Sequence, residues 1–66
     1  MDILLNGEPR TVAADCRIAD LLQLEGLGAR RVAVEVNGVI VPRGAHAGHV
    51  LQGGDRVEIV HALGGG

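Results

Sequence analysis

The clearest periodic signal in the chain is the run Ile18-Ala19-Asp20-Leu21-Leu22-Gln23-Leu24. In this run Ile18, Leu21 and Leu22 have the i, i+3, i+4 spacing of one helical face, and Leu24 extends the pattern. The spacing therefore predicts one amphipathic helix whose apolar side faces a core.

The helix has a clear stop signal and two possible starts. Gly26 is a typical residue just beyond a helix end. Asp15 is the better capping residue by its chemistry, whereas Asp20 stands three residues after Arg17, where a helix-start acid is often found. The sequence leaves the first residue of the helix open.

Short strands lie on both sides of the predicted helix. Asn6-Gly7 and Asn37-Gly38 are dipeptides that favour tight hairpin turns. Gly53-Gly54-Asp55 is a further turn signal before a final strand, while the segments 25–31 and 44–49 have no strand or helix pattern. The expected strands are Ile3 to Leu5, Pro9 to Val12, Val32 to Val36, Val39 to Val41 and Arg56 to His61.

This element order predicts a two-layer α+β domain, with a sheet of four or five strands packed on one helix. A small closed barrel is the alternative, but such barrels seldom need a strongly amphipathic helix after the first hairpin, so we favour the open sheet. The 66 residues, 47% of them hydrophobic, suit a single self-folding domain. We expect residues 1–63 to form it and residues 64–66 to be a flexible tail.

Composition argues against several functions. The chain has no Ser, Lys or Tyr, which removes several common nucleophiles and acid–base groups. A net charge of −2 and the absence of aromatic residues argue against nucleic acid as a partner. No apolar run is long enough to span a bilayer and the start of the chain does not resemble a signal peptide, so we expect a cytoplasmic protein without a membrane partner.

The final strand and the chain beyond it are the strongest candidates for a functional site. The alternation places Val60 on the face opposite Val57 and Ile59, and Leu4, Ala33 and Ile40 join Val60 there if the registers match. Such aliphatic residues form either a patch for a partner or an ordinary scatter of exposed side chains. Gly64-Gly65-Gly66 can thread a narrow channel, although taken alone it also fits a frayed end.

Other reactive residues have simpler interpretations. Cys16, near a helix start, is either a reactive thiolate or a small buried hydrophobic residue, and we favour the latter. His46, His49 and His61 are weak support for a metal site, so we expect solvated histidines and no metal. Arg30-Arg31 is interpreted as a solvated loop, and Arg43 has no role beyond a surface contact.

Two blocks of sequence resemble the thiamin-biosynthesis sulfur carriers, the ThiS-like branch of the ubiquitin-like β-grasp proteins. These blocks are Val36-Asn37-Gly38-Val39-Ile40-Val41-Pro42-Arg43 and Gly54-Asp55-Arg56-Val57-Glu58-Ile59-Val60-His61-Ala62-Leu63-Gly64-Gly65-Gly66. Length, opening hairpin and helix fit as well. The resemblance implies a β-grasp fold with a mixed sheet.

The resemblance also implies a function. A ThiF-like adenylating enzyme, related to ubiquitin-activating enzymes, would use ATP to adenylate the carboxylate of Gly66, and a sulfur donor such as a cysteine desulfurase would supply the sulfur of a thiocarboxylate. Thiazole synthase would then receive that sulfur. Leu63, Gly64 and Gly65 would guide the tail into its partners, with Val60, Ile40 and Leu4 as the docking surface. The chain itself would be no enzyme and would bind no cofactor.

Four alternatives remain. The small subunit of molybdopterin synthase uses the same terminal chemistry, but such chains tend to be longer, with aromatic residues and a Pro-rich approach to the terminal glycines. A ubiquitin-like modifier is the second, although a chain without Lys cannot branch on itself. A plain binding module whose glycines are a linker is the third, and an enzyme built around Cys16 and a histidine is the fourth.

Overall fold

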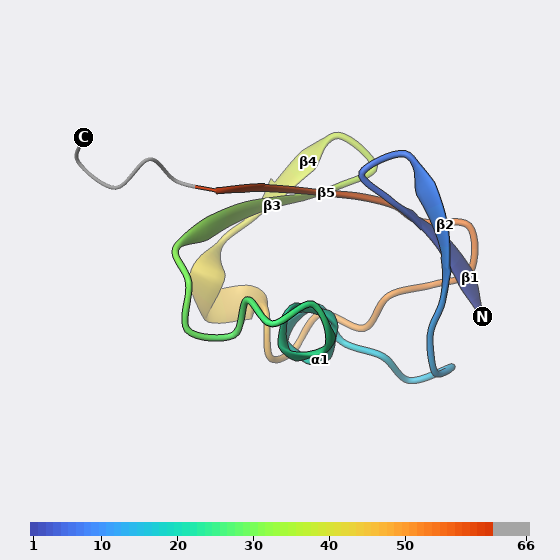
Figure 1. The fold of residues 1–66 in the computed structure, drawn as a ribbon, viewed down its shortest axis with the longest axis horizontal. Coiled ribbons are helices and arrows are strands. Elements are labelled where there is room, and N and C mark those ends of the chain that lie inside the picture. Colours follow the sequence, from blue (N-terminus) through green and yellow to red (C-terminus); the bar gives the residue numbers. More distant parts are fainter. Residues whose placement is uncertain (62–66) are drawn as a thin grey trace.

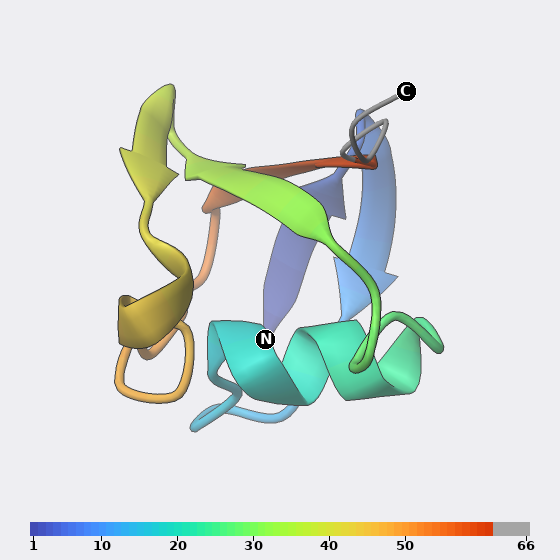
Figure 2. The same ribbon diagram turned by 90° about the vertical axis from the view of Figure 1, so that its left-hand side faces the viewer.

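A computed structural model describes residues 1–61 of the chain and has the predicted two layers. Figure 1 shows one helix, α1, lying beneath a five-stranded sheet. Figure 2 shows the strands of the sheet above the helix, which lies along one face of the sheet. The elements in chain order are β1 (Asp2–Leu5), β2 (Glu8–Thr11), α1 (Ile18–Leu24), β3 (Val32–Val36), β4 (Val39–Val41), the 3₁₀ turn η1 (Arg43–Ala45) and β5 (Arg56–His61).

The sheet is mixed, with the strand order β2-β1-β5-β3-β4. Both hairpins are antiparallel, and β5 lies between them, parallel to β1 and antiparallel to β3. The expectation of an α+β fold with an open sheet over one helix is confirmed. The last strand of the chain is thus the central strand of the sheet.

Both hairpins turn at the predicted Asn-Gly pairs. Asn6 and Asn37 have φ angles of 51° and 53°, and the glycines that follow them have φ angles of 83° and 85°. Two consecutive positive φ angles are the requirement of a type I′ turn, whose twist matches that of the strands it joins. Asparagine and glycine tolerate this region better than other residues, which is why the two dipeptides locate the turns correctly.

The helix starts at Ile18, which resolves the boundary that the sequence left open. Arg17 has the extended backbone of a capping residue, and its N–H donates to the Asp20 carboxylate at 3.0 Å. This hydrogen bond is one half of a capping box, the half in which the third helical residue accepts from the capping backbone. The other half does not form, because an arginine side chain has no atom that can accept a hydrogen bond from the helix. Asp20, not Asp15, is therefore the acid at the helix start.

One aliphatic core lies between the layers. The predicted helix residues Ile18, Leu21 and Leu22 are buried in it, but Leu24 is 69% exposed and its expected place on the apolar face is wrong. The segment after η1 adds Leu51, which periodicity did not reveal. The buried hydrophobic residues are Ile3, Leu5, Val12, Cys16, Ile18, Leu21, Leu22, Val34, Val36, Val41, Leu51, Val57 and Ile59.

Candidate functional site

The candidate site is the end of β5 together with the outer face of the sheet. Figure 1 shows β5 running through the middle of the sheet toward the C-terminal end of the chain. The predicted tail residues, Leu63 and Gly64 to Gly66, lie outside the described residues, as does the predicted boundary between the domain and its tail. The structure therefore shows how the chain is held as far as His61, the last residue of β5.

Strand β5 is held along both edges. On one side β3 pairs with it from Val36 opposite Val57 to Val32 opposite His61. On the other side β1 pairs only near the start of β5, with Leu5 beside Val57. The pairing with β3 therefore fixes the direction of the chain as far as His61.

The two turn asparagines extend this hold. The Ile59 N–H donates to Asn6 Oδ1 at 2.8 Å, which satisfies a backbone group of β5 just beyond the end of β1. Asn37 Oδ1 accepts the Arg56 N–H at 2.9 Å, and Asn37 Nδ2 donates to the Asp55 carboxylate at 3.0 Å. Each hairpin turn thus anchors one part of the strand that leads into the tail.

The outer face of the sheet carries the three residues predicted as a docking surface. Val60 and Ile40 are 58% and 60% exposed, and Leu4 is 38% exposed. The register places Ala33 directly opposite Val60, as the alternation suggested. All four residues lie on the face turned away from α1.

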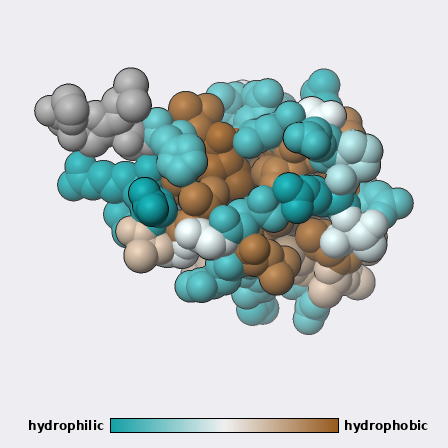
Figure 3. Space-filling view, in the orientation of Figure 1, coloured by the Kyte–Doolittle hydropathy of each residue, from teal (hydrophilic) through white to brown (hydrophobic). Residues whose placement is uncertain are grey.

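The same register separates Leu4 and Ile40 by polar residues. Glu35 lies opposite both Ile40 and Glu58, so two carboxylates face each other across β3 and β5. Leu4 lies beside Arg56, and these two residues help to line a depression of about 230 Å³. Figure 3 shows the molecule from the side seen in Figure 1, where hydrophobic and hydrophilic groups are mixed across the surface. The sequence reasoning missed this pair of acids, which cross-strand registers alone reveal.

Cys16 is buried, with 3% of its surface exposed. Burial raises the pKa of its thiol above the ordinary value of 9.0, and the nearby charges of Asp20 and Asp15 raise it further. A high pKa keeps the sulfur in its unreactive thiol form. The interpretation as a small hydrophobic residue is the one that the structure supports.

The three histidines do not all lie in solvent. His46 is only 7% exposed, and its Nε2 lies 3.0 Å from the Val41 carbonyl oxygen, so its predicted solvation is wrong. The reason is that η1 turns the chain back over the core and brings the ring to the end of β4. Within residues 1–61, no three His, Cys, Asp or Glu side chains are grouped closely enough to hold a metal ion.

Comparison with known proteins identifies the family. The model of the ThiS family matches residues 3–66. The chain belongs to the ThiS family. The predicted resemblance is thereby confirmed, and the mixed sheet over one helix is the β-grasp, ubiquitin-like fold of this family.

Solved structures of ThiS proteins are similar over the whole chain. The crystal structure of the thiamine biosynthesis protein ThiS from Geobacter metallireducens is 36% identical, with a TM-score of 0.85 and full coverage of both chains. A solution structure of a thiamine biosynthesis protein from the same organism is 33% identical, with a TM-score of 0.79, and the match covers all of this chain and 88% of that one.

Curated relatives include much longer proteins. The thiazole synthases of Magnetococcus marinus and Paramagnetospirillum magneticum are 44% and 41% identical to this chain over 66 residues. The match covers all of this chain but 20% of each relative, so the chain spans about a fifth of their length. In both relatives, a region similar to this ThiS chain is part of a protein named thiazole synthase.

No helix among residues 1–61 is both long and apolar enough to cross a membrane.

Proposed function

We propose that this chain is a cytoplasmic sulfur carrier in thiamin biosynthesis and that the carboxylate of Gly66 carries the sulfur. Membership of the ThiS family is the observation that carries the proposal. The geometry of β5 supports it, because the two hairpins hold this central strand, whose last residue, His61, lies just before the proposed tail. The chain acts as a co-substrate of other enzymes and supplies no catalytic residue.

The chemistry requires activation of Gly66. A free α-carboxyl group is anionic near neutral pH and is a poor electrophile. A ThiF-like adenylating enzyme joins it to the α-phosphate of ATP and releases pyrophosphate. A donor such as a cysteine desulfurase offers persulfide sulfur, and a thiol reduces it to hydrosulfide while a disulfide forms. The hydrosulfide then adds to the acyl carbon, and AMP leaves. The product is a thiocarboxylate, which is a softer and better nucleophile than the carboxylate.

Thiazole synthase is the proposed acceptor of the sulfur. Two proteins of that name contain a region similar to this entire chain, which supports a working association between the two modules. In this proposal Leu63, Gly64 and Gly65 pass through the narrow entrances of both enzymes, since glycines add no side-chain bulk. The outer face with Val60, Ile40 and Leu4 provides the docking surface.

Removal of Gly65 and Gly66 tests the proposal. We expect the shortened chain to keep its fold, measured by circular dichroism and urea unfolding, and to lose all sulfur loading by the adenylating enzyme. Cys16→Ala is the matched control and keeps full loading, because the carrier chemistry does not use the thiol. Sulfur loading of the shortened chain, or its loss in Cys16→Ala with the fold intact, would contradict the proposal.

A further inference from the structure

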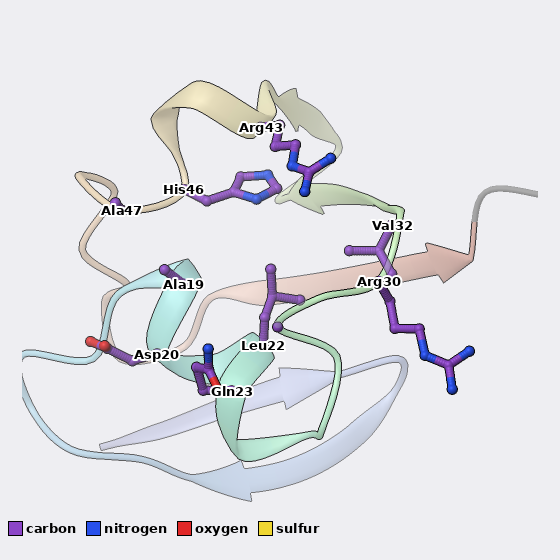
Figure 4. Close-up of a pocket in the computed structure, with 10 residues that line it drawn as sticks. Ala19, Asp20, Leu22, Gln23, Arg30, Val32, Arg43, His46 and Ala47 are labelled. Atoms are coloured by element: carbon purple, nitrogen blue, oxygen red, sulfur yellow. The ribbon is translucent and has the colours of Figure 1, made fainter. Parts of the chain in front are cut away.

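A second recessed surface lies on the helix side of the molecule, away from the outer face. It is a cleft of about 280 Å³ between α1, the start of β3 and the segment that begins with η1. Figure 4 shows the side chains that line it. The lining residues used below are Leu22 and Gln23 from α1, Arg30 and Val32 from the approach to β3, and Arg43 and His46 from the segment around η1.

The cleft has two cationic groups that lack partners among residues 1–61. Within residues 1–61, neither the Arg30 nor the Arg43 guanidinium takes part in an ion pair or a hydrogen bond; the ion pair found there joins Arg10 to Glu25. Asp20 is the acid of the cleft, and its carboxylate accepts the Arg17 N–H at the helix start. In Figure 4 this carboxylate points away from both arginines. The chain carries a net charge of −2, yet this cleft is locally positive.

Arg43 is presented on an anchored turn. The His46 N–H donates to the Arg43 carbonyl at 3.1 Å and the Ala19 N–H of α1 donates to the His46 carbonyl at 3.1 Å. The buried His46 ring also lies 3.0 Å from the Val41 carbonyl of β4. These contacts attach the backbone around Arg43 to the helix and to the sheet. The turn that carries the Arg43 guanidinium is therefore already ordered before a ligand binds.

The cleft lies near the end of the sheet at which β5 finishes. Val32 lines the cleft and pairs with His61, the last residue of β5. An enzyme that receives the chain beyond His61 must therefore approach this end of the sheet. The cleft lies close to that end of the sheet, because Val32 belongs to both.

We propose that the cleft receives an acidic side chain of the adenylating enzyme, with its carboxylate bound by Arg43 and attracted by Arg30. The inference rests on the proposed function. A planar guanidinium fits a carboxylate through two parallel hydrogen bonds. Leu22 and Val32 offer apolar surface for the methylene groups of Asp or Glu.

Charge reversal at Arg43 tests the inference. We would measure by calorimetry the dissociation constant between the full chain and a bacterial ThiF-like adenylating enzyme. Arg43→Glu is expected to raise it about tenfold or more, because a carboxylate then faces a carboxylate. Arg43→Lys keeps the charge without the planar fork and is expected to lie between Arg43→Glu and the unaltered chain.

Arg17→Glu is the matched control, since it makes the same charge change at an exposed residue that does not line the cleft. It is expected to change the dissociation constant by less than about twofold. Urea unfolding checks that each variant is folded, and Arg43→Gln replaces Arg43→Glu if the latter does not fold. Equal binding of the Arg43 variants and the unaltered chain, or equal weakening by Arg17→Glu, would overturn the inference.

The same samples separate this inference from the proposed function. Sulfur loading of the unaltered chain together with unchanged binding of the Arg43 variants would overturn the cleft assignment and leave the carrier function standing. Absence of any loading of the unaltered chain by an active enzyme would contradict the carrier function and, with it, the cleft assignment.

Discussion

At the scale of single residues, the potentially reactive side chains differ in their exposure to solvent. Cys16 and His46 are buried within the fold, whereas His61 is exposed at the end of β5. Neither buried group serves the proposed sulfur chemistry, which belongs to a backbone carboxylate. Substitutions of Cys16 and His46 are therefore expected to change the stability of the fold and not the transfer of sulfur.

Cys16 gives a pH-dependent prediction. Its pKa is raised by burial in the folded chain, so on unfolding the thiol regains its ordinary value near 9.0. Above that pH the unfolded chain loses a proton that the folded chain keeps, and the free energy of unfolding falls as pH rises until the folded pKa is reached. We expect the unaltered chain to lose stability relative to Cys16→Ala as the pH rises through about 9, the ordinary pKa of the thiol, and until the raised pKa of the folded chain is passed.

Urea unfolding of both proteins across this range checks the prediction. The comparison is clean because the chain has no Tyr or Lys to titrate in the same window. A constant difference between the two proteins would mean that the thiol is not shielded in the folded state.

Val60 gives a prediction about docking. Val60→Arg places a long charged side chain on the outer face, and we expect it to weaken binding to the adenylating enzyme about tenfold. Since Val60 is 58% exposed, the free energy of unfolding should change by less than about 0.5 kcal/mol.

Val39→Arg is the matched control for Val60→Arg. Val39 is 66% exposed and lies opposite Val36, a core residue, so its position belongs to the other face of the sheet. Unchanged affinity of a folded Val60→Arg protein, measured by calorimetry, would exclude a docking patch at Val60.

At the scale of elements, the hairpin turns do more than reverse the chain. Asn6 closes the first hairpin and also accepts the Ile59 N–H of β5. Asn6→Gly keeps a residue that tolerates a positive φ but removes this acceptor. We expect it to lower the free energy of unfolding by about 1 kcal/mol and to speed hydrogen exchange at the Ile59 amide.

Asn6→Asp is the control for this prediction, because aspartate also tolerates positive φ and retains an acceptor oxygen. Its Ile59 amide should exchange nearly as slowly as that of the unaltered chain. Equal protection of Ile59 in the glycine and aspartate variants, measured by NMR, would show that the side chain does not hold β5.

At the scale of the whole molecule, the fold divides into one buried and two exposed regions of interest. The inner face of the sheet and α1 enclose the core, the outer face carries the proposed docking residues, and the cleft with Arg30 and Arg43 lies on the helix side. Both exposed regions adjoin β5 or its end. A partner that takes up the tail is therefore offered an apolar, partly acidic face and a basic cleft.

The sequence predicted local structure well and long-range placement poorly. The expected helix Ile18–Leu24 and final strand Arg56–His61 agree with the structure because periodicity and turn chemistry are local signals. The pairing of β1 with β5 joins chain segments far apart in sequence, and no local pattern encodes it. His46 and Leu51 are buried through the path of an irregular segment, which hydrophobic spacing does not describe.

The same contrast applies to the candidate site. Val60, Ile40 and Leu4 were predicted on one face by alternation, and they lie there. Two other features could not be predicted from the sequence. The pairing of Glu35 with Glu58 depends on the strand register, and the cleft around Arg43 depends on the tertiary structure. Gly66, the central residue of the account, lies outside the described residues and stays a prediction from the sequence.

The most direct test of the account is the intact mass of the full chain after incubation with ATP, a sulfide source and a bacterial ThiF-like adenylating enzyme. A sulfur carrier is expected to gain the mass difference between one sulfur and one oxygen, and fragmentation is expected to map this gain to Gly66. An unchanged mass, with the chain folded and the enzyme active on a known carrier, would contradict the proposed sulfur-carrier function.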